Sequence, residues 1–300
     1  MRAPDTEIAD GTLLLGVDAG GTRCRARLAD CRGQVLGEGH GLAANVLSNP
    51  AGAWASIQQA MLSALQAAGV AASSLGEIVS VLGLAGLDPA RPEAPANWPL
   101  SRFRACRVET DAFIAQQGAF GGGDGAILIV GTGSVGLLVR GGEHISVGGY
   151  GAAVSDEGSG AWIGREAIRR ALWAFDRRLP SSLLTGHILD AVGEPPAAQA
   201  WANAARPADY AALTTAVFTA VEAGDRQAAE IIEEAAAHLD HILVRLAEAG
   251  ARQVCLMGGL ATVLKPWLKT GAVEIVEPRG TALDGAVLLA RELARPRNAP

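Results

Sequence analysis

Cysteine is scarce in this chain, and clusters of basic residues are absent. The four cysteines stand at positions 24, 31, 106 and 255, and no two of them form a CxxC pair. The sequence therefore predicts neither a zinc site nor a disulfide framework, and reduced thiols favour a cytoplasmic protein. Lys and Arg never run together for more than two residues, and the formal net charge at pH 7 is −6. Nucleic acid and anionic membrane surfaces are therefore disfavoured as partners.

Long apolar runs are missing as well. The most apolar segments, Ile78–Leu87 and Ala126–Val139, are short or broken by glycine, and both fall below the ~20 apolar residues that a membrane span needs. Met1–Gly11 carries acids where an export signal would have a basic region and an apolar stretch. We therefore expect a cytoplasmic protein that does not cross a bilayer.

Small and apolar residues dominate the rest. Of the 300 residues, 49% are hydrophobic, 38 are glycine and 14 are proline. The high apolar content and the modest proline content favour a buried core over disorder. A chain of this length commonly folds as about two domains.

Two segments of the chain resemble each other. Leu13–Ala29 reads LLLGVDAGGTRCRARLA, and Ala126–Gly142 reads AILIVGTGSVGLLVRGG. Each has an apolar strand-like run, a glycine-rich turn with threonine and a second strand-like run. A third short strand is expected after each, at Gln34–Gly39 and Glu143–Gly148. The pattern indicates a duplicated unit, although two unrelated hairpins with similar turns remain the alternative.

The remaining segments alternate between helical and strand-like patterns. Strands mixed with crossover helices predict an α/β architecture. We expect the duplicated units to head two domains that face each other across a cleft, the first formed by residues 1–111 and 282–300 and the second by residues 112–281. The expected strands are Ile78–Leu84, Arg107–Glu109 and Gln253–Met257, and the expected helices are Pro50–Ala68, Ala161–Leu179, Ser182–Val192, Ala197–Ala205, Tyr210–Ala223, Gln227–Ala249 and Ala282–Leu293.

The first glycine turn, Gly16–Arg23, places an acid at the end of a strand and follows it with two glycines and a hydroxyl group. Glycines let backbone N–H groups point together into an anion-binding nest, which suits a phosphate. Asp18 beside that phosphate could hold Mg²⁺ through water, because Mg²⁺ prefers oxygen ligands and keeps much of its hydration shell. A plain hairpin turn is the alternative.

The second turn, Gly131–Gly136, matches the GxGxxG dinucleotide pattern, and Asp156 lies where a ribose-binding acid could fall. That pattern has meaning only where it opens a helix, whereas Val135–Arg140 has the profile of a strand. We therefore reject the dinucleotide interpretation. A third turn, Met257–Ala261, joins a strand to a helix and could contact a nucleotide.

Together these segments resemble the sugar-kinase, actin and heat-shock ATPase superfamily, in particular its N-acetylglucosamine-kinase-like (BadF/BadG/BcrA/BcrD ATPase) branch and the bacterial glucosamine kinases within it. The resemblance covers almost the whole chain and implies two ribonuclease-H-like domains of the actin-like ATPase type. The segments that carry it are GVDAGGTRCRARL (Gly16–Leu28), AANVL (Ala43–Leu47), GLAG (Gly83–Gly86), TDA (Thr110–Ala112), GTGS (Gly131–Ser134), GGYGAAVSDEGSGAWIG (Gly148–Gly164) and CLMGGLA (Cys255–Ala261).

The resemblance also implies roles for individual residues. Asp111 stands at the position of the catalytic base, and we expect it to have an ordinary pKa, about 3.9, so that it is ionised at pH 7. Asp18 would hold Mg²⁺. The resemblance implies ATP binding by Gly20, Gly21, Thr22, Gly131, Thr132, Gly133, Gly258 and Gly259, and sugar binding by Asn45, Gly149, Tyr150 and Asp156. We further expect Arg23 and Ser134 to contribute to ATP binding, and Asp111 and Glu157 to sugar binding.

The acid pair Asp156 and Glu157 bears on the choice of sugar. A free amino group on the substrate carries positive charge, and one of these carboxylates could pair with it; a helix N-terminal role is the alternative. We expect ATP-dependent phosphorylation of D-glucosamine at its 6-hydroxyl. The alternatives are N-acetyl-D-glucosamine as substrate, since Tyr150 could help to form an acetyl pocket, and a sugar-responsive regulator without catalysis.

Two departures from related proteins restrict these expectations. The glucokinase-like branch carries a Cys- and His-rich zinc motif that this chain lacks, so we expect no structural zinc. The dehydratase-activating ATPases bind an iron–sulfur cluster through cysteines that flank a helix pair, whereas the cysteines here fall mostly in strand-like runs. The expected partners are therefore an amino sugar and ATP with Mg²⁺, and a homodimer is the oligomer we consider.

Overall fold

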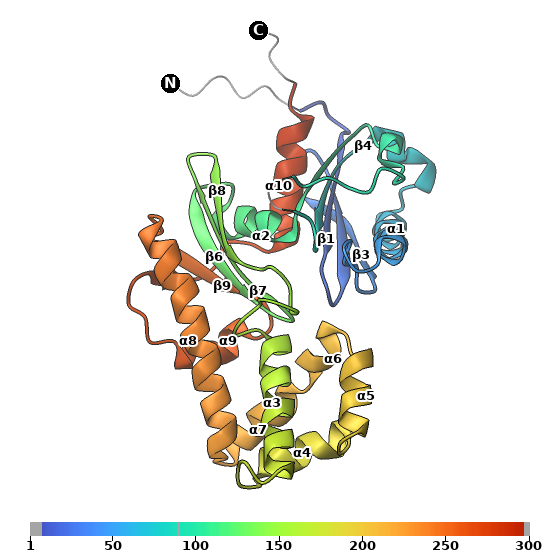
Figure 1. Ribbon diagram of the computed structural model, residues 1–300. Coiled ribbons are helices and arrows are strands. Elements are labelled where there is room, and N and C mark those ends of the chain that lie inside the picture. Colours follow the sequence, from blue (N-terminus) through green and yellow to red (C-terminus); the bar gives the residue numbers. More distant parts are fainter. Residues whose placement is uncertain (1–7, 89–90, 297–300) are drawn as a thin grey trace. The chain divides into compact units, whose positions relative to one another are not determined.

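The computed structural model describes residues 8–88 and 91–296, and its chain forms two compact α/β units (Figure 1). The first unit runs up to Asp124 and resumes at Glu277, and the second is Gly125–Val276. The expectation of two α/β domains is confirmed. No helix in the part of the chain that the structure describes combines the length and the apolar character needed to cross a membrane.

The first unit is a five-stranded mixed sheet of order β3-β2-β1-β4-β5 with helices on both faces. The β1–β2 and β2–β3 pairs are antiparallel, and the β1–β4 and β4–β5 pairs are parallel. Its elements are β1 (Leu13–Ala19), β2 (Cys24–Ala29), β3 (Val35–Gly41), α1 (Pro50–Ala67), η1 (Ala72–Glu77), β4 (Ile78–Leu84), η2 (Leu100–Arg102), β5 (Ala105–Thr110), α2 (Asp111–Phe120) and α10 (Ala282–Ala294).

Alternating side chains on β1 contact helices on opposite faces of this sheet. Leu15 and Val17 belong to the buried core that includes Ile57 and Leu65 of α1. Gly16, between them, faces α10, and a Cβ there would lie 2.9 Å from the Cβ of Ala286. The sheet is therefore covered by α1 on one face and by α10 on the other, which fixes the ends of β1, β4 and β5 where the candidate site lies.

The second unit repeats this sheet with the order β10-β9-β6-β7-β8. Its core joins the sheet to α3 and α8, through residues such as Leu128, Ile163 and Leu239. The elements are β6 (Gly125–Val130), β7 (Ser134–Arg140), β8 (Glu143–Gly148), α3 (Gly160–Phe175), α4 (Leu183–Val192), α5 (Ala197–Ala204), α6 (Pro207–Ala212), α7 (Thr214–Glu222), α8 (Arg226–Glu248), β9 (Gln253–Met257), α9 (Ala261–Leu264), η3 (Lys265–Trp267) and β10 (Glu274–Val276).

Every strand of one sheet has a counterpart in the other. The antiparallel pairs β6–β7 and β7–β8 correspond to β1–β2 and β2–β3 of the first sheet. The parallel pairs β6–β9 and β9–β10 correspond to β1–β4 and β4–β5. The predicted duplication therefore includes all five strands and not only the first three. Strand β10 was not predicted, because a strand of three residues is too short to show a pattern. The predicted helix over residues 210–223 is two helices, α6 and α7, separated at Leu213.

Contacts within the chain place the first division between the two units after Asp124, whereas the predicted boundary lies near residue 112. Helix α2, which the prediction placed in the second domain, packs on α10 of the first unit. A Cβ on Gly118 would lie 1.9 Å from the carbonyl oxygen of Thr281, and a Cβ on Gly285 would lie 1.9 Å from that of Ile114. These two glycines let the helices approach closely, so α2 belongs to the first unit and the division falls after Asp124.

Candidate functional site

The turn between β1 and β2 presents bare backbone to solvent. The N–H of Gly20 donates to the carbonyl of Arg23 at 3.0 Å, which closes the turn. Gly21, Thr22 and Arg23 are exposed, and a Cβ on Gly21 would find no atom within 4 Å. The turn therefore leaves room for a phosphate group beside its backbone, as an anion-binding loop requires.

Asp18 is paired with an arginine that the sequence prediction missed. Asp18 and Arg25 are directly opposite on β1 and β2, and the Arg25 guanidinium donates to Oδ2 of Asp18 at 2.6 Å. The two residues stand at equal distances from the hairpin turn, so hairpin symmetry could have identified the pair. Oδ1 of Asp18 accepts no hydrogen bond from a described residue.

The surroundings of Asp18 fit Mg²⁺ held mainly by water and phosphate. No group of three or more His, Cys, Asp or Glu residues in the described ranges could hold a metal ion. Mg²⁺ commonly takes one or two carboxylates and fills its other positions with water and substrate phosphates. One free carboxylate oxygen beside an exposed glycine turn fits that pattern.

Asp111 is the first residue of α2, directly after β5. The Thr110 hydroxyl caps the helix by accepting the N–H of Phe113 at 3.1 Å, and Oδ1 of Asp111 accepts the N–H of Ala112 at 2.9 Å. Burial, followed by the negative charge of Asp18, raises the pKa of Asp111 to about 6. The expectation of an ordinary pKa is therefore wrong, because the carboxyl group loses solvent and lies near a second carboxylate.

Asn45 lies in the segment between β3 and α1, beside the residue that follows β4 and next to the first glycine turn. It forms an isolated bridge with Ala85, and the neighbouring Ala44 donates its N–H to the carbonyl of Gly20 at 2.9 Å. The Asn45 Oδ1 atom accepts the N–H of Ser48 at 3.0 Å. Gly86 has a φ of +85°, and a Cβ there would lie 2.7 Å from Oδ1 of Asn45. A side chain at position 86 would therefore clash with Asn45, so Gly86 allows Asn45 to take its position. The sequence prediction assigned Gly86 no role in the site.

The second glycine turn joins β6 to β7 and also holds the start of α3. The carbonyls of Gly131 and Thr132 accept the N–H groups of Gly160 at 2.8 Å and Ala161 at 3.1 Å. Strand β7 starts at Ser134, so the GxGxxG pattern continues into a strand and the dinucleotide interpretation is correctly rejected. A Cβ on Gly131 would find no atom within 4 Å, although Gly131, Thr132 and Gly133 are only partly exposed, unlike the exposed first turn.

The third turn, Gly258–Gly259, lies against the second. Gly258 has a φ of +95°, and a Cβ there would lie 2.3 Å from the carbonyl oxygen of Val130. The N–H of Leu260 donates to that same oxygen at 3.0 Å. Since Val130 directly precedes Gly131, the structure brings the second and third predicted nucleotide turns together within the second unit.

Asp156 is buried behind the second turn. Its carboxylate accepts backbone N–H groups of Gly151 and Ser134, and burial raises its pKa despite these hydrogen bonds. A Cβ on Gly133 would lie 2.7 Å from Oδ2 of Asp156, and Asp156 itself has a left-handed φ of +59°. The carboxylate therefore supports the turn from inside.

Glu157 is more accessible than Asp156. Its side chain is half-buried, and its Oε2 accepts the hydroxyl of Ser155 at 3.1 Å, while its backbone carbonyl accepts the hydroxyl of Ser134 at 2.8 Å. Tyr150, in the loop after β8, is 77% exposed, and Gly149 before it has a φ of +79°. The predicted sugar residues of this unit therefore differ in exposure: Tyr150 is exposed, Glu157 is half-buried and Asp156 is buried.

The predicted residues form a group within each unit. Asp18, the Gly20–Arg23 turn, Asn45 and Asp111 lie at the carboxyl-end edge of the first sheet, and the second unit groups the Gly131–Ser134 turn with Gly258 and Asp156. The first group offers carboxylates beside an exposed glycine turn, and the second offers a further glycine turn beside the acids Asp156 and Glu157. These are the components that phosphoryl transfer requires.

Comparisons with known proteins agree with this chemistry. The model of the BadF/BadG/BcrA/BcrD ATPase family matches residues 15–290. The chain is 32% identical to a glucosamine kinase of Vibrio cholerae serotype O1, over 92% of this chain and 95% of that protein. It is 29% identical to an N-acetylmuramic acid/N-acetylglucosamine kinase of Clostridium acetobutylicum, over 75% of this chain and 76% of that one. A solved structure from Chromobacterium violaceum, provisionally described as an N-acetylglucosamine kinase, aligns with a TM-score of 0.83 at 33% identity, over 93% and 99% of the two chains.

Proposed function

The chain belongs to the BadF/BadG/BcrA/BcrD ATPase family, and on that basis we propose that it is an ATP-dependent kinase that phosphorylates the 6-hydroxyl of D-glucosamine. The observation that carries the proposal is Asp111, a carboxylate with a pKa of about 6 at a helix start, near Asp18. A general base works best when its pKa lies close to the working pH. The 32% identity to a glucosamine kinase over nearly the whole chain favours this sugar.

The open glycine turns are the proposed nucleotide contacts. No protein atom lies within 4 Å of the position that a Cβ would take on Gly21 or Gly131, so a ligand has space there. The two turns would bind phosphate oxygens through backbone N–H groups. The Gly258–Gly259 turn would contact the adenosine. Asp18 would hold Mg²⁺, which neutralises phosphate charge when bound.

Asp111 is proposed to orient the sugar hydroxyl and to take up its proton. As the bond between the sugar oxygen and the γ-phosphorus forms, the bond from that phosphorus to the ADP oxygen breaks, and the hydroxyl proton passes to Asp111. Phosphoryl transfer proceeds through a loose transition state, so the protein mainly positions the reactants and stabilises charge. With a pKa of about 6, Asp111 is mostly ionised at pH 7 and can accept the proton.

Glu157 is the proposed partner of the substrate amine. Asp156 is buried and accepts two backbone N–H groups, whereas the side chain of the half-buried Glu157 has one hydrogen-bond partner among the described residues, the hydroxyl of Ser155. A protonated amine would form a charge-assisted hydrogen bond with Glu157. Asn45, Gly149, Tyr150 and Asp156 would complete the contacts to the sugar.

N-acetyl-D-glucosamine is the second candidate substrate. The Clostridium relative is named as a kinase of acetylated amino sugars, and the exposed Tyr150 could pack against an acetyl group. Purified protein should be assayed for ADP release with glucosamine, N-acetylglucosamine, glucose and mannosamine. Glucosamine should give the highest kcat/KM. A higher value for N-acetylglucosamine would exchange the two candidates, and no sugar-dependent ADP release would favour the non-catalytic regulator.

The cellular compartment and the oligomeric state of the enzyme are also part of the proposal. Cys24, Cys31, Cys106 and Cys255 form no disulfide within the part of the chain that the structure describes, which together with the use of ATP suits the cytoplasm. A homodimer that binds neither nucleic acid nor membranes remains the predicted form.

A further inference from the structure

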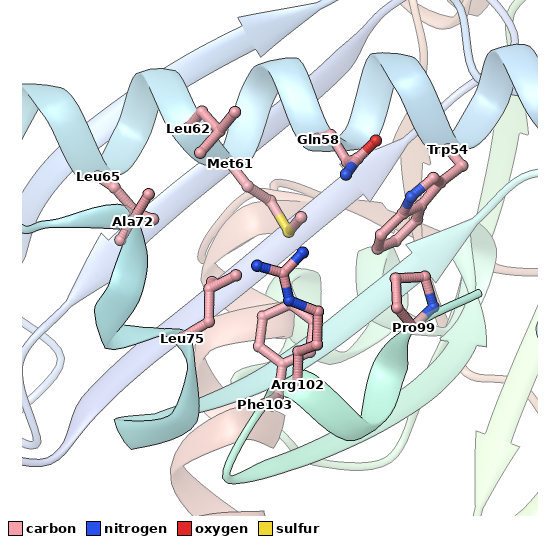
Figure 2. A pocket seen from close by; sticks show the side chains of 10 residues that line it. All are labelled: Trp54, Gln58, Met61, Leu62, Leu65, Ala72, Leu75, Pro99, Arg102 and Phe103. Atoms are coloured by element: carbon pink, nitrogen blue, oxygen red, sulfur yellow. The ribbon is translucent and has the colours of Figure 1, made fainter.

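The first unit contains an apolar pocket that the proposed kinase reaction does not use. The pocket lies between α1, η1 and η2 and has a volume of about 170 Å³. Figure 2 shows Trp54, Met61 and Leu62 of α1 on one side, with Leu75 of η1 opposite them. None of the predicted catalytic, sugar or nucleotide residues lines it.

The size and the rim of the pocket suit a small molecule. An apolar cavity of about 150 Å³ holds one molecule of the size of benzene. Leu62 on the rim is 48% exposed, so the pocket is accessible from solvent. Its walls are nearly all apolar, and a six-membered ring or a short aliphatic chain would therefore be favoured inside it.

Two polar side chains line the pocket, those of the solvent-exposed Arg102 and the half-buried Gln58. Arg102 and Gln58 form no side-chain hydrogen bond or ion pair with any residue that the structure describes. In Figure 2 the Arg102 guanidinium lies among the apolar side chains, and the sulfur of Met61 points toward it. An unpaired guanidinium beside an apolar cavity is complementary to a carboxylate attached to an apolar body, because the fork of N–H groups matches the two carboxylate oxygens.

We propose that this pocket binds a small organic acid, with its carboxylate on Arg102 and its apolar body, of about one six-membered ring, between α1 and η1. The Gln58 amide would donate a second hydrogen bond to the acid.

Helix α1 connects this pocket to the proposed sugar residue Asn45. The carbonyl of Asn45 accepts the N–H of Asn49 at 3.1 Å, and Asn49 caps α1 by accepting the N–H of Gly52 at 3.0 Å. Trp54, which lines the pocket, follows in the next turn of the same helix and stacks on Trp98 with ring centroids 5.0 Å apart. A ligand that moves α1 would therefore displace Asn45, and the acid acts as an effector of sugar binding. This second step rests on the proposed function.

Binding is tested first without sugar or nucleotide, by calorimetry with cyclohexanecarboxylate. Its neutral analogue cyclohexylmethanol and inorganic phosphate serve as comparisons, since each lacks one half of the proposed ligand. We expect the carboxylate to bind at least tenfold more tightly than either. Equal binding of phosphate, or no binding of the carboxylate, would overturn the proposal.

Two pairs of variants locate the site. Arg102→Gln should weaken carboxylate binding about tenfold and leave the alcohol unchanged, whereas Arg104→Gln removes the same charge two residues away and should change neither. Ala72→Phe should fill the pocket and abolish binding, while Ala71→Phe adds the same ring beside it. Ala72 lines the pocket and Ala71 does not, and both are exposed, so both variants should fold. Equal affinities within either pair would place the ligand elsewhere.

Coupling is tested by linkage. The acid should change the dissociation constant of glucosamine, and glucosamine should change that of the acid by the same factor. The Ala72→Phe variant should lose the effect while it still binds the sugar. If the acid binds and sugar affinity does not change, the effector role is wrong. If the protein does not bind glucosamine, the proposed substrate fails while the acid-binding measurement stands by itself.

Discussion

The negative charge of Asp18 raises the pKa of Asp111, although the two residues belong to different elements of the first unit. Asp18 lies near the end of β1, and Asp111 follows β5, with β4 between these strands in the sheet. Because β1, β4 and β5 are parallel, their carboxyl ends meet at one edge, and the fold brings the two acids together there. Burial, followed by this proximity to Asp18, raises the pKa of Asp111 to about 6.

The rate should depend on the ionisation of Asp111. A base must be unprotonated, so kcat/KM should fall as the pH decreases through about 6. A rate that stays constant down to pH 4.5 would show that Asp111 does not ionise in this range or is not the base.

The contribution of Asp18 to this pKa can be measured without metal or substrate. In ¹³C NMR of carboxyl groups, Asp18→Asn should lower the pKa of Asp111, but only part of the way to 3.8, because burial is the larger cause of the shift. Asp190→Asn, at an exposed position on α4 of the second unit, is the matched control and should leave the pKa unchanged. An unaltered pKa in the Asp18 variant would refute the electrostatic link.

Stability should respond to the same group. The pKa of Asp111 is higher in the folded protein than its ordinary 3.8, so the folded state binds the proton more tightly and loses stability as the pH rises from about 4 to about 6. Asp111→Asn cannot titrate. Its free energy of unfolding relative to wild type should therefore increase over this range by up to about 3 kcal/mol. Urea denaturation at pH 4 and pH 7 measures this difference, and a constant difference would contradict the raised pKa.

Loss of the base should affect turnover more than binding. Asp111→Asn keeps the shape of the side chain and removes proton acceptance, so kcat should fall by about 10²–10⁴, while glucosamine and ATP still bind. Steady-state kinetics together with calorimetry of both ligands would separate the two effects. Turnover near the wild-type value would remove Asp111 from its proposed role.

The open glycines predict a specific loss of nucleotide affinity. Gly21→Ala and Gly131→Ala place a methyl group where no protein atom lies within 4 Å, so folding should be unaffected while KM for ATP rises about tenfold or more as phosphate contacts are blocked. Gly186→Ala, which is equally open but lies on α4, should leave KM unchanged and slightly stabilise its helix. Wild-type KM values in both loop variants would show that the turns do not hold phosphate.

Glu157 should determine the preference for the free amine. Glu157→Gln removes the negative charge, and the ratio of kcat/KM for glucosamine to that for N-acetylglucosamine should fall about tenfold, because the charge-assisted hydrogen bond is lost. The kcat for glucose, which has no amine, should change little and serves as the internal control. An unchanged ratio would limit Glu157 to holding the start of α3.

The strands other than β10, the duplicated turns and the rejection of the dinucleotide fold were predictable because they depend on local patterns. The glycine turn of Gly20–Arg23 and the strand start at Ser134 are examples. The raised pKa of Asp111 was not predictable, since burial and the Asp18 charge arise only when β1 and β5 join one sheet. The packing of Gly118 on the Thr281 carbonyl likewise joins residues far apart in the chain, and the domain boundary therefore needed the structure.

Kinase activity toward glucosamine is identified by the products of the reaction. Wild-type protein with ATP, Mg²⁺ and D-glucosamine should be followed by ³¹P NMR and mass spectrometry. We expect ADP and glucosamine 6-phosphate in equal amounts, with neither formed at a comparable rate by Asp111→Asn. ADP without a phosphorylated sugar, or a phosphate on another hydroxyl, would contradict this expectation.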